Sequence, residues 1–178
     1  MMKKGICCIL LIFYCLGFAA CGILDGRISP KTLEKLYAKN QSLFIEIKEI
    51  LENKQIELKS NYMAINDKIE KSNDGKYRIF ISLSQVDSKQ IEKLTDVFTG
   101  EDSKKIENIF KMGFVYIESG DDNSAFGSYC SFSEQGFLDC NDEIIFVENP
   151  KKFEDFISKD DDEIIKKLGD NWYIYGVR

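Results

Sequence analysis

The stretch "SPKTLEKLYAKNQSLFIEIKEILENKQIELKSNYMAINDKIEKSNDG", residues 29–75, sets the first half of the fold. Ser29 and Pro30 have the residue types of a helix N-cap and first helical position, and neither Gly nor Pro occurs from Lys31 to Asp74. Apolar residues recur at helical spacing: Leu33, Leu36, Tyr37, Leu43, Phe44, Ile47, Ile50, Leu51, Leu58, Tyr62, Ile65 and Ile69. The sequence therefore predicts an amphipathic helical segment over residues 31–74.

The length of this segment leaves its shape open. One continuous helix would measure about 60 Å, which is longer than a single domain of this size needs. A break near Asn53–Gln55 or near Ser60–Asn61 would instead give an antiparallel helical pair. The apolar stripe favours a core helix over a coiled-coil or partner-binding helix.

The rest of the chain alternates between strand and helix patterns. Strands are predicted over 76–84, 114–119, 127–142 as a hairpin, 143–148 and 171–177, and helices over 87–100, 101–113, from Asn149 and Pro150 onward, and over 160–169. The sum is an α+β fold, with the N-terminal amphipathic helical segment packed on a mainly antiparallel sheet of about five strands and short helices between them. Residues 29–178 are expected to form a single domain.

The first residues, "MMKKGICCILLIFYCLGFAAC", have a charged start, an apolar middle and a small-residue end. That order is typical of a secretory signal peptide. Its last four residues, "FAAC" (Phe18–Cys21), resemble the lipobox of bacterial lipoproteins, although the first lipobox position is usually leucine and is Phe18 here.

The resemblance implies cleavage before Cys21 by signal peptidase II and lipidation of that cysteine. Residues 1–20 would then be the signal peptide and residues 21–28 a lipidated tether, with the membrane bound through the N-terminal lipid. Two alternatives are ordinary cleavage after Ala20 and an uncleaved signal anchor, since Gly5–Leu24 is an uncharged run of 20 residues.

Charge restricts the partners of the mature chain. Cleavage before Cys21 removes 20 of 178 residues, including two lysines and no acid, which leaves 158 residues and changes the formal net charge from −6 to −8. A negative net charge argues against a nucleic-acid partner, because phosphates are bound by clustered Lys and Arg. It argues equally against binding anionic lipid through charge, so the acyl chains would supply the anchorage.

Cys130 and Cys140 lie ten positions apart in "GSYCSFSEQGFLDCND", residues 127–142. A three-residue turn at Glu134–Gly136 would place the two cysteines opposite each other in a hairpin, with Phe132 opposite Leu138. Export favours a disulfide there, worth roughly 2–3 kcal/mol. The alternative of a redox or metal-binding pair lacks the C-x-x-C spacing and the histidines that such sites use.

No constellation in the sequence carries recognisable chemistry. The chain has no histidine, which excludes histidine-based catalytic arrangements, and it has no phosphate-binding glycine loop. Asp121–Asn123 and Asp160–Glu163 lack the ligand spacing of a calcium loop. We therefore expect no catalytic residue, no metal site and no cofactor.

Near the C-terminus, the stretch "NWYIYGV", residues 171–177, contains Trp172, Tyr173 and Tyr175, which we predict as a binding surface. Exposed aromatics often mark such surfaces, although buried aromatics on a strand are commoner.

These observations favour a non-enzymatic lipoprotein of the bacterial cell envelope. Its soluble domain would bind an unknown protein partner or neutralise an envelope-directed factor. The alternatives are a carboxylate-dependent enzyme acting on cell wall or polysaccharide, and a structural adapter that oligomerises through the N-terminal helix. Enteric-type lipoproteins that stay at the inner membrane have an aspartate directly after the lipidated cysteine. This chain has Gly22 there, which favours the outer membrane.

Overall fold

The structure is a computed structural model that describes residues 28–73, 76–85, 90–122, 126–134, 142–158 and 163–176. The first part of the chain contributes α2 (Pro30–Leu58), β1 (Ser60–Lys71), β2 (Tyr77–Gln85), β3 (Gln90–Thr95) and α3 (Gly100–Phe110). The second part contributes β4 (Tyr116–Asp122), β5 (Gly127–Ser133), β6 (Asp142–Val147), α4 (Pro150–Ile157), β7 (Glu163–Gly169) and β8 (Trp172–Gly176).

All the described strands belong to one sheet of eight, in the order β3-β2-β1-β4-β5-β6-β8-β7. Every neighbouring pair is antiparallel. The α+β architecture and the N-terminal helix on an antiparallel sheet are thus confirmed, and the expected five strands are corrected to eight.

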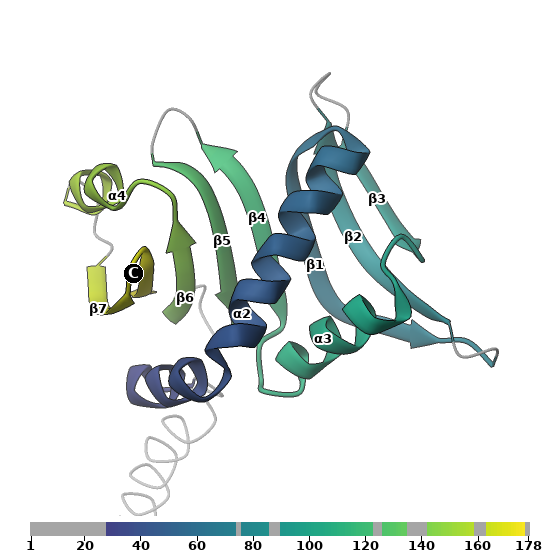
Figure 1. Cartoon of the computed structure of the whole chain (residues 1–178), viewed down its shortest axis with the longest axis horizontal. Helices are drawn as coiled ribbons and strands as arrows, with labels where there is room; N and C mark the ends of the chain where they lie inside the picture. Colours follow the sequence, from purple (N-terminus) through teal and green to yellow (C-terminus); the bar gives the residue numbers. More distant parts are fainter. Residues whose placement is uncertain are drawn as a thin grey trace, which may run out of the picture.

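Helices α2 and α3 lie on the same face of the sheet (Figure 1). The main core forms beneath them, where Leu33, Phe44 and Ile47 of α2 meet Ile65 of β1 and Phe132 of β5, all 0% exposed. A second, smaller core joins Phe153 and Ile157 of α4 to the apolar residues Phe126, Ile145, Val147 and Tyr173. Because side chains alternate along a strand, Ile145 and Tyr173 point away from the α2 side, so α4 covers the opposite face at the β6–β8 end.

The predicted helix over 31–74 is wrong beyond Leu58. Lys59 adopts a left-handed conformation (φ 51, ψ 47) whose N–H bonds to the carbonyls of Gln55 and Ile56, and this ends α2. The break falls where Ser60–Asn61 was proposed, but the next residues form strand β1 rather than a second helix. Asn40, with φ −126 and ψ 23, adds a kink within α2.

Two other predicted helices are also strands. Residues 87–100 contain β3, which pairs with β2 from Ile79↔Thr95 to Ser84↔Gln90. Residues 160–169 contain β7, which pairs with β8. The predictions for the other elements are confirmed in kind, namely β2, α3, β4, β5, β6, α4 and β8.

Candidate binding face

In the described part of the chain, no helix covers the face of β1, β4 and β5 that lies opposite α2. On β1, β4 and β5, the residues that point away from α2 alternate with core residues such as Met63, Ile117 and Phe132. The register aligns these outward residues in three rows: Tyr62, Gly120 and Tyr129; Ala64, Glu118 and Ser131; and Asn66, Tyr116 and Ser133. Five of them are partly exposed, namely Asn66 and the four residues Tyr62, Tyr116, Glu118 and Tyr129. We call these last four the tyrosine–glutamate cluster.

Small residues form the floor of this face. Ala64 is 1% exposed and Ser131 is 2% exposed, and they flank Glu118 on its two sides in the sheet. Because these neighbours are short, the longer side chains of the cluster can lie across them rather than project into water. The result is a carboxylate held among buried small residues.

Glu118 accepts hydrogen bonds from two hydroxyl groups. The Tyr62 hydroxyl donates to Glu118 Oε2 at 2.9 Å, and the Ser131 hydroxyl donates to the same carboxylate. Burial raises the pKa of Glu118 above its ordinary value, and the two hydrogen bonds oppose this rise by stabilising the charged form. Burial and the neighbouring Glu118 charge raise the pKa of Tyr62 as well, so its hydroxyl stays a donor.

The tyrosine rings frame the carboxylate along β4. A Cβ added at Gly120 would lie 2.9 Å from the Tyr129 ring, so that ring passes directly over the glycine. Tyr62 flanks Gly120 from the other neighbouring strand. Tyr116 lies two residues before Glu118 on the same side of β4, which puts aromatic side chains on both sides of the carboxylate along the strand.

A cavity of about 410 Å³ adjoins the Tyr116 end of the cluster. Asn66, Lys68, Tyr116 and Ser133 are among its lining residues. Asp67 and Glu134 also line it, so the wall combines two carboxyl groups with an amide, an ammonium group, a phenol and a hydroxyl. Such a lining provides both hydrogen-bond donors and acceptors next to the tyrosine–glutamate cluster.

The aromatic residues predicted from the C-terminal stretch lie elsewhere. Trp172 is 4% exposed and packs among Tyr37, Phe44 and Phe146, whereas Tyr173 is 1% exposed and packs on Phe153. Both are core residues, so the tentative binding surface is corrected for them. Tyr175 is partly exposed and contacts the Phe153 ring at 5.6 Å between centroids.

The predicted hairpin register at Cys130 is also wrong. Cys130 lies opposite Phe146 of β6 on one side and opposite Ser119 of β4 on the other. Phe132 faces Ile144 instead of Leu138, so the connection after β5 is longer than a three-residue turn. This register places Phe132, Ile144 and Trp172 together in the main core.

The partner predicted for Cys130, Cys140, lies outside the described residues, and the disulfide stays a prediction. Cys130 itself is a free thiol in the described part of the chain and is 0% exposed. Burial raises the pKa of this thiol strongly, which suppresses the reactive thiolate.

We expect Cys130 to resist alkylation by iodoacetamide in the native protein and to become accessible to the reagent only in denaturant. The physical reason is its complete burial between Phe146 and Ser119. Mass analysis of the alkylated chain measures this directly. Alkylation of Cys130 only after reduction would instead establish the bridge predicted from the sequence.

The predicted lipidation site, Cys21, and the acidic residues Asp160–Asp162 also lie outside the described residues.

Within the ranges that the structure describes, no helix has the length and apolarity needed to cross a membrane. In those same ranges, no three side chains of His, Cys, Asp or Glu gather as a metal site would require.

Comparisons with protein-family models, curated proteins and solved structures find no match to this chain.

The sequence patterns did not predict the tyrosine–glutamate cluster, because Tyr62 fitted the apolar stripe of the predicted helix. The alternation in "NYMAIND", residues 61–67, is the signal that could have indicated a strand with Tyr62 and Asn66 on one face.

Proposed function

We propose that this chain is a non-enzymatic lipoprotein of the bacterial cell envelope, anchored through Cys21, with the outer membrane favoured. Its domain binds a protein partner through the helix-free face of β1, β4 and β5. The lipobox-like Phe18–Cys21 supports the anchor. The tyrosine–glutamate cluster supports the binding role and is the observation that carries it.

The chemistry of the cluster favours a cationic side chain of the partner. Burial penalises the charged form of Glu118. A neutral residue at this position would therefore make the free protein more stable. An ammonium or guanidinium group of the partner would give Glu118 an opposite charge to pair with. The rings of Tyr62, Tyr116 and Tyr129 can add cation–π attraction, and tyrosine is enriched at the energetic centres of interfaces. We therefore infer that a Lys or Arg side chain of the partner reaches Glu118.

The other function classes find less support in the same residues. Glycoside hydrolysis uses two carboxyl groups about 5–9 Å apart, whereas the cluster combines one carboxyl group with hydroxyls. An adapter that oligomerises through the N-terminal helix needs a free apolar stripe. Helix α2 buries Leu33, Phe44 and Ile47 against its own sheet.

Glu118→Gln tests the proposed interface. A photo-crosslinking amino acid at Tyr116 in intact cells should give one defined crosslinked species. We expect Glu118→Gln to reduce its yield more than tenfold, because removing one member of a buried charge pair typically costs about 2–5 kcal/mol. The same substitution should raise the free energy of unfolding at neutral pH by about 0.5–2 kcal/mol, since a carboxylate retained for function usually costs stability.

The pH dependence has a defined sign. Because the pKa of Glu118 is raised in the folded state, the fold prefers the protonated acid. The unfavourable contribution of the carboxylate appears as pH rises through this raised pKa. The stability gain of Glu118→Gln should therefore shrink toward acidic pH, and crosslinking of the unmodified chain should weaken there.

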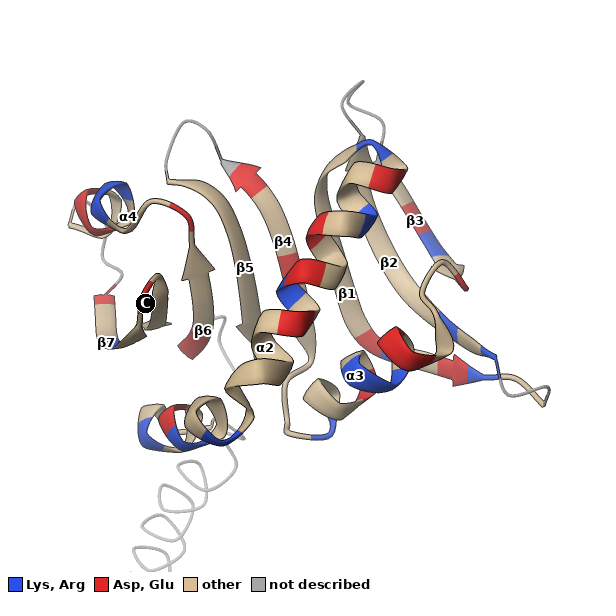
Figure 2. Cartoon of the chain, viewed as in Figure 1, with Lys and Arg blue, Asp and Glu red and all other residues tan. Residues whose placement is uncertain are grey.

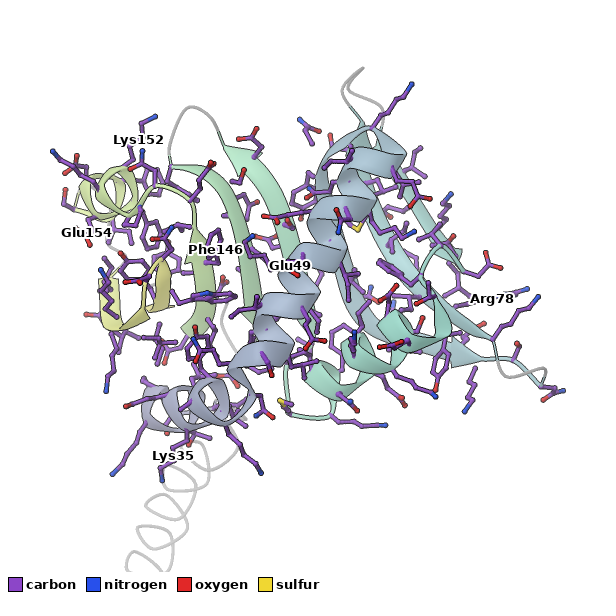
Figure 3. The ribbon with its side chains drawn as sticks, in the orientation of Figure 1. Lys35, Glu49, Arg78, Phe146, Lys152 and Glu154 are labelled. Atoms are coloured by element: carbon purple, nitrogen blue, oxygen red, sulfur yellow. The ribbon has the colours of Figure 1, made fainter. Side chains whose placement is uncertain are left out.

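Glu154→Gln is the matched control, because Glu154 also accepts a hydrogen bond from a tyrosine, Tyr173, at 3.3 Å. Glu154 lies on α4 (Figure 3), whereas Glu118 lies on β4. Its replacement should leave the crosslink unchanged. An equal loss in both variants, or an unchanged yield in Glu118→Gln, would rule out a specific role for Glu118 in binding.

A further inference from the structure

The chain enters the folded domain at a fixed point. The backbone N–H of Ile28 donates to Glu134 Oε1 at 2.6 Å, and Glu134 is only 3% exposed. The Ile28 side chain also lies against Gly113, where an added Cβ would come within 3.0 Å of it. A buried carboxylate and a close packing contact therefore hold the start of the described chain beside the end of α3.

Three lysines lie on the first part of α2, directly after this entry point. Lys31, Lys35 and Lys39 are all exposed, and their spacing of four residues aligns them along one side of the helix. The opposite side of this part buries Leu33 and Tyr37 in the main core. Figure 3 shows Lys35 pointing outward from this segment, away from the sheet.

Charge is unevenly distributed along α2. Residues 30–39 carry three lysines and one glutamate, and that glutamate, Glu34, pairs with Lys166 at 2.7 Å. Residues 40–58 carry two lysines and four glutamates, and both lysines pair with glutamates of the same helix. In Figure 2 the first segment of α2 is mainly blue, whereas red and blue alternate along the second. The basic end of α2 is thus the end nearest the entry point of the chain.

Covalent geometry keeps this basic end close to the proposed anchor. Seven residues lead from Cys21 to Ile28, and even a fully extended chain spans no more than about 3.6 Å per residue, or about 25 Å in all. Lys31 lies one helical turn beyond Ile28. A lipid on Cys21 would therefore hold the lysines within reach of the headgroups.

We propose that the exposed face of Lys31, Lys35 and Lys39 docks on anionic lipid headgroups and so orients the domain on its membrane. The inference rests on the lipid anchor proposed above. Basic residues near an anionic bilayer each gain attraction that fades within a Debye length. The acidic net charge belongs to the whole chain, whereas residues 30–39 carry three lysines and one glutamate, and that glutamate pairs with Lys166. Since Leu33 and Tyr37 are buried in the core, the contact is electrostatic and needs no insertion of α2.

Amine labelling of the full chain in vesicles tests the proposal. The protein is reconstituted into phosphatidylcholine vesicles with or without phosphatidylglycerol, treated with an amine-reactive reagent and analysed by mass spectrometry. We expect phosphatidylglycerol to slow labelling of Lys31, Lys35 and Lys39 about threefold or more. Salt at 1 M should abolish this protection, because it shortens the Debye length to about 3 Å.

Lys151 and Lys152 are the internal controls, because both are exposed residues of α4; Figure 3 labels Lys152. Their labelling should not respond to phosphatidylglycerol. Flotation of the same vesicles separates the two proposals. A chain that floats but shows equal labelling of all five lysines, or protection of Lys151 and Lys152 instead, overturns the docking alone. A chain that does not float with either vesicle overturns both the docking and the anchor.

Discussion

Replacement of Phe44 by alanine is expected to lower the free energy of unfolding by about 3–5 kcal/mol. Phe44 is 0% exposed, and its ring centroid lies 4.9 Å from that of Phe132, 5.6 Å from that of Tyr37 and 6.3 Å from that of Trp172. The substitution would open a cavity where α2 meets the sheet. Total stabilities are only about 5–15 kcal/mol, so the loss would remove a large share.

The chain provides its own reporter for this measurement. Trp172 is its one tryptophan and belongs to the same aromatic group as Phe44, so denaturant titration followed by fluorescence observes the affected core directly. Ile56→Ala is the matched control on the same helix. Ile56 is 78% exposed, and its truncation should change stability by less than about 0.5 kcal/mol. Comparable losses in both variants would contradict the packing of α2 described above.

The elements that sequence patterns predicted correctly are those whose periodicity agrees with their burial. Pro30 begins α2 as expected, and the alternation of Ile79, Ile81 and Leu83 in β2 places all three in the main core. In such segments the local pattern already contains the information that packing uses. No knowledge of the neighbouring strands is needed.

The wrongly predicted segments show what local patterns lack. β3 and β7 are the two edges of the sheet, and edge strands commonly carry charged residues that prevent further pairing. Glu92 and Lys93 in β3, and Lys166 and Lys167 in β7, give these strands the charged appearance of a surface helix. Pairing with β2 and β8 overrides helical propensity there, and pairing is a property of the whole sheet.

The tyrosine–glutamate cluster was out of reach for the same reason. Its members come from three strands, with Tyr62 on β1, Glu118 on β4 and Tyr129 on β5, and the sheet register alone brings them together. A sequence pattern can assign each residue to a face of its strand. It cannot say which strands are neighbours when the order is β1-β4-β5.

Cys21→Ser is expected to abolish incorporation of labelled palmitate and to leave the chain unprocessed. The physical reason is that the acyl chains need the Cys21 thiol, and each buried methylene contributes about 0.8 kcal/mol to membrane attachment. Intact-mass analysis should find the unsubstituted protein as an acylated chain of 158 residues, starting at Cys21 of the 178 encoded. The variant should keep the full length.

Cys15→Ser is the control for this experiment, because it removes a thiol from the same apolar segment six residues earlier and spares the proposed lipidation site. It should be processed and acylated like the unsubstituted chain. Acylation that persists in Cys21→Ser would mean that another cysteine carries the lipid. An unsubstituted protein of full length and without acyl chains would favour the uncleaved anchor over Gly5–Leu24. The lysines of α2 would then reach the membrane through a spanning segment instead of a lipid, and their labelling in anionic vesicles would still measure the docking independently.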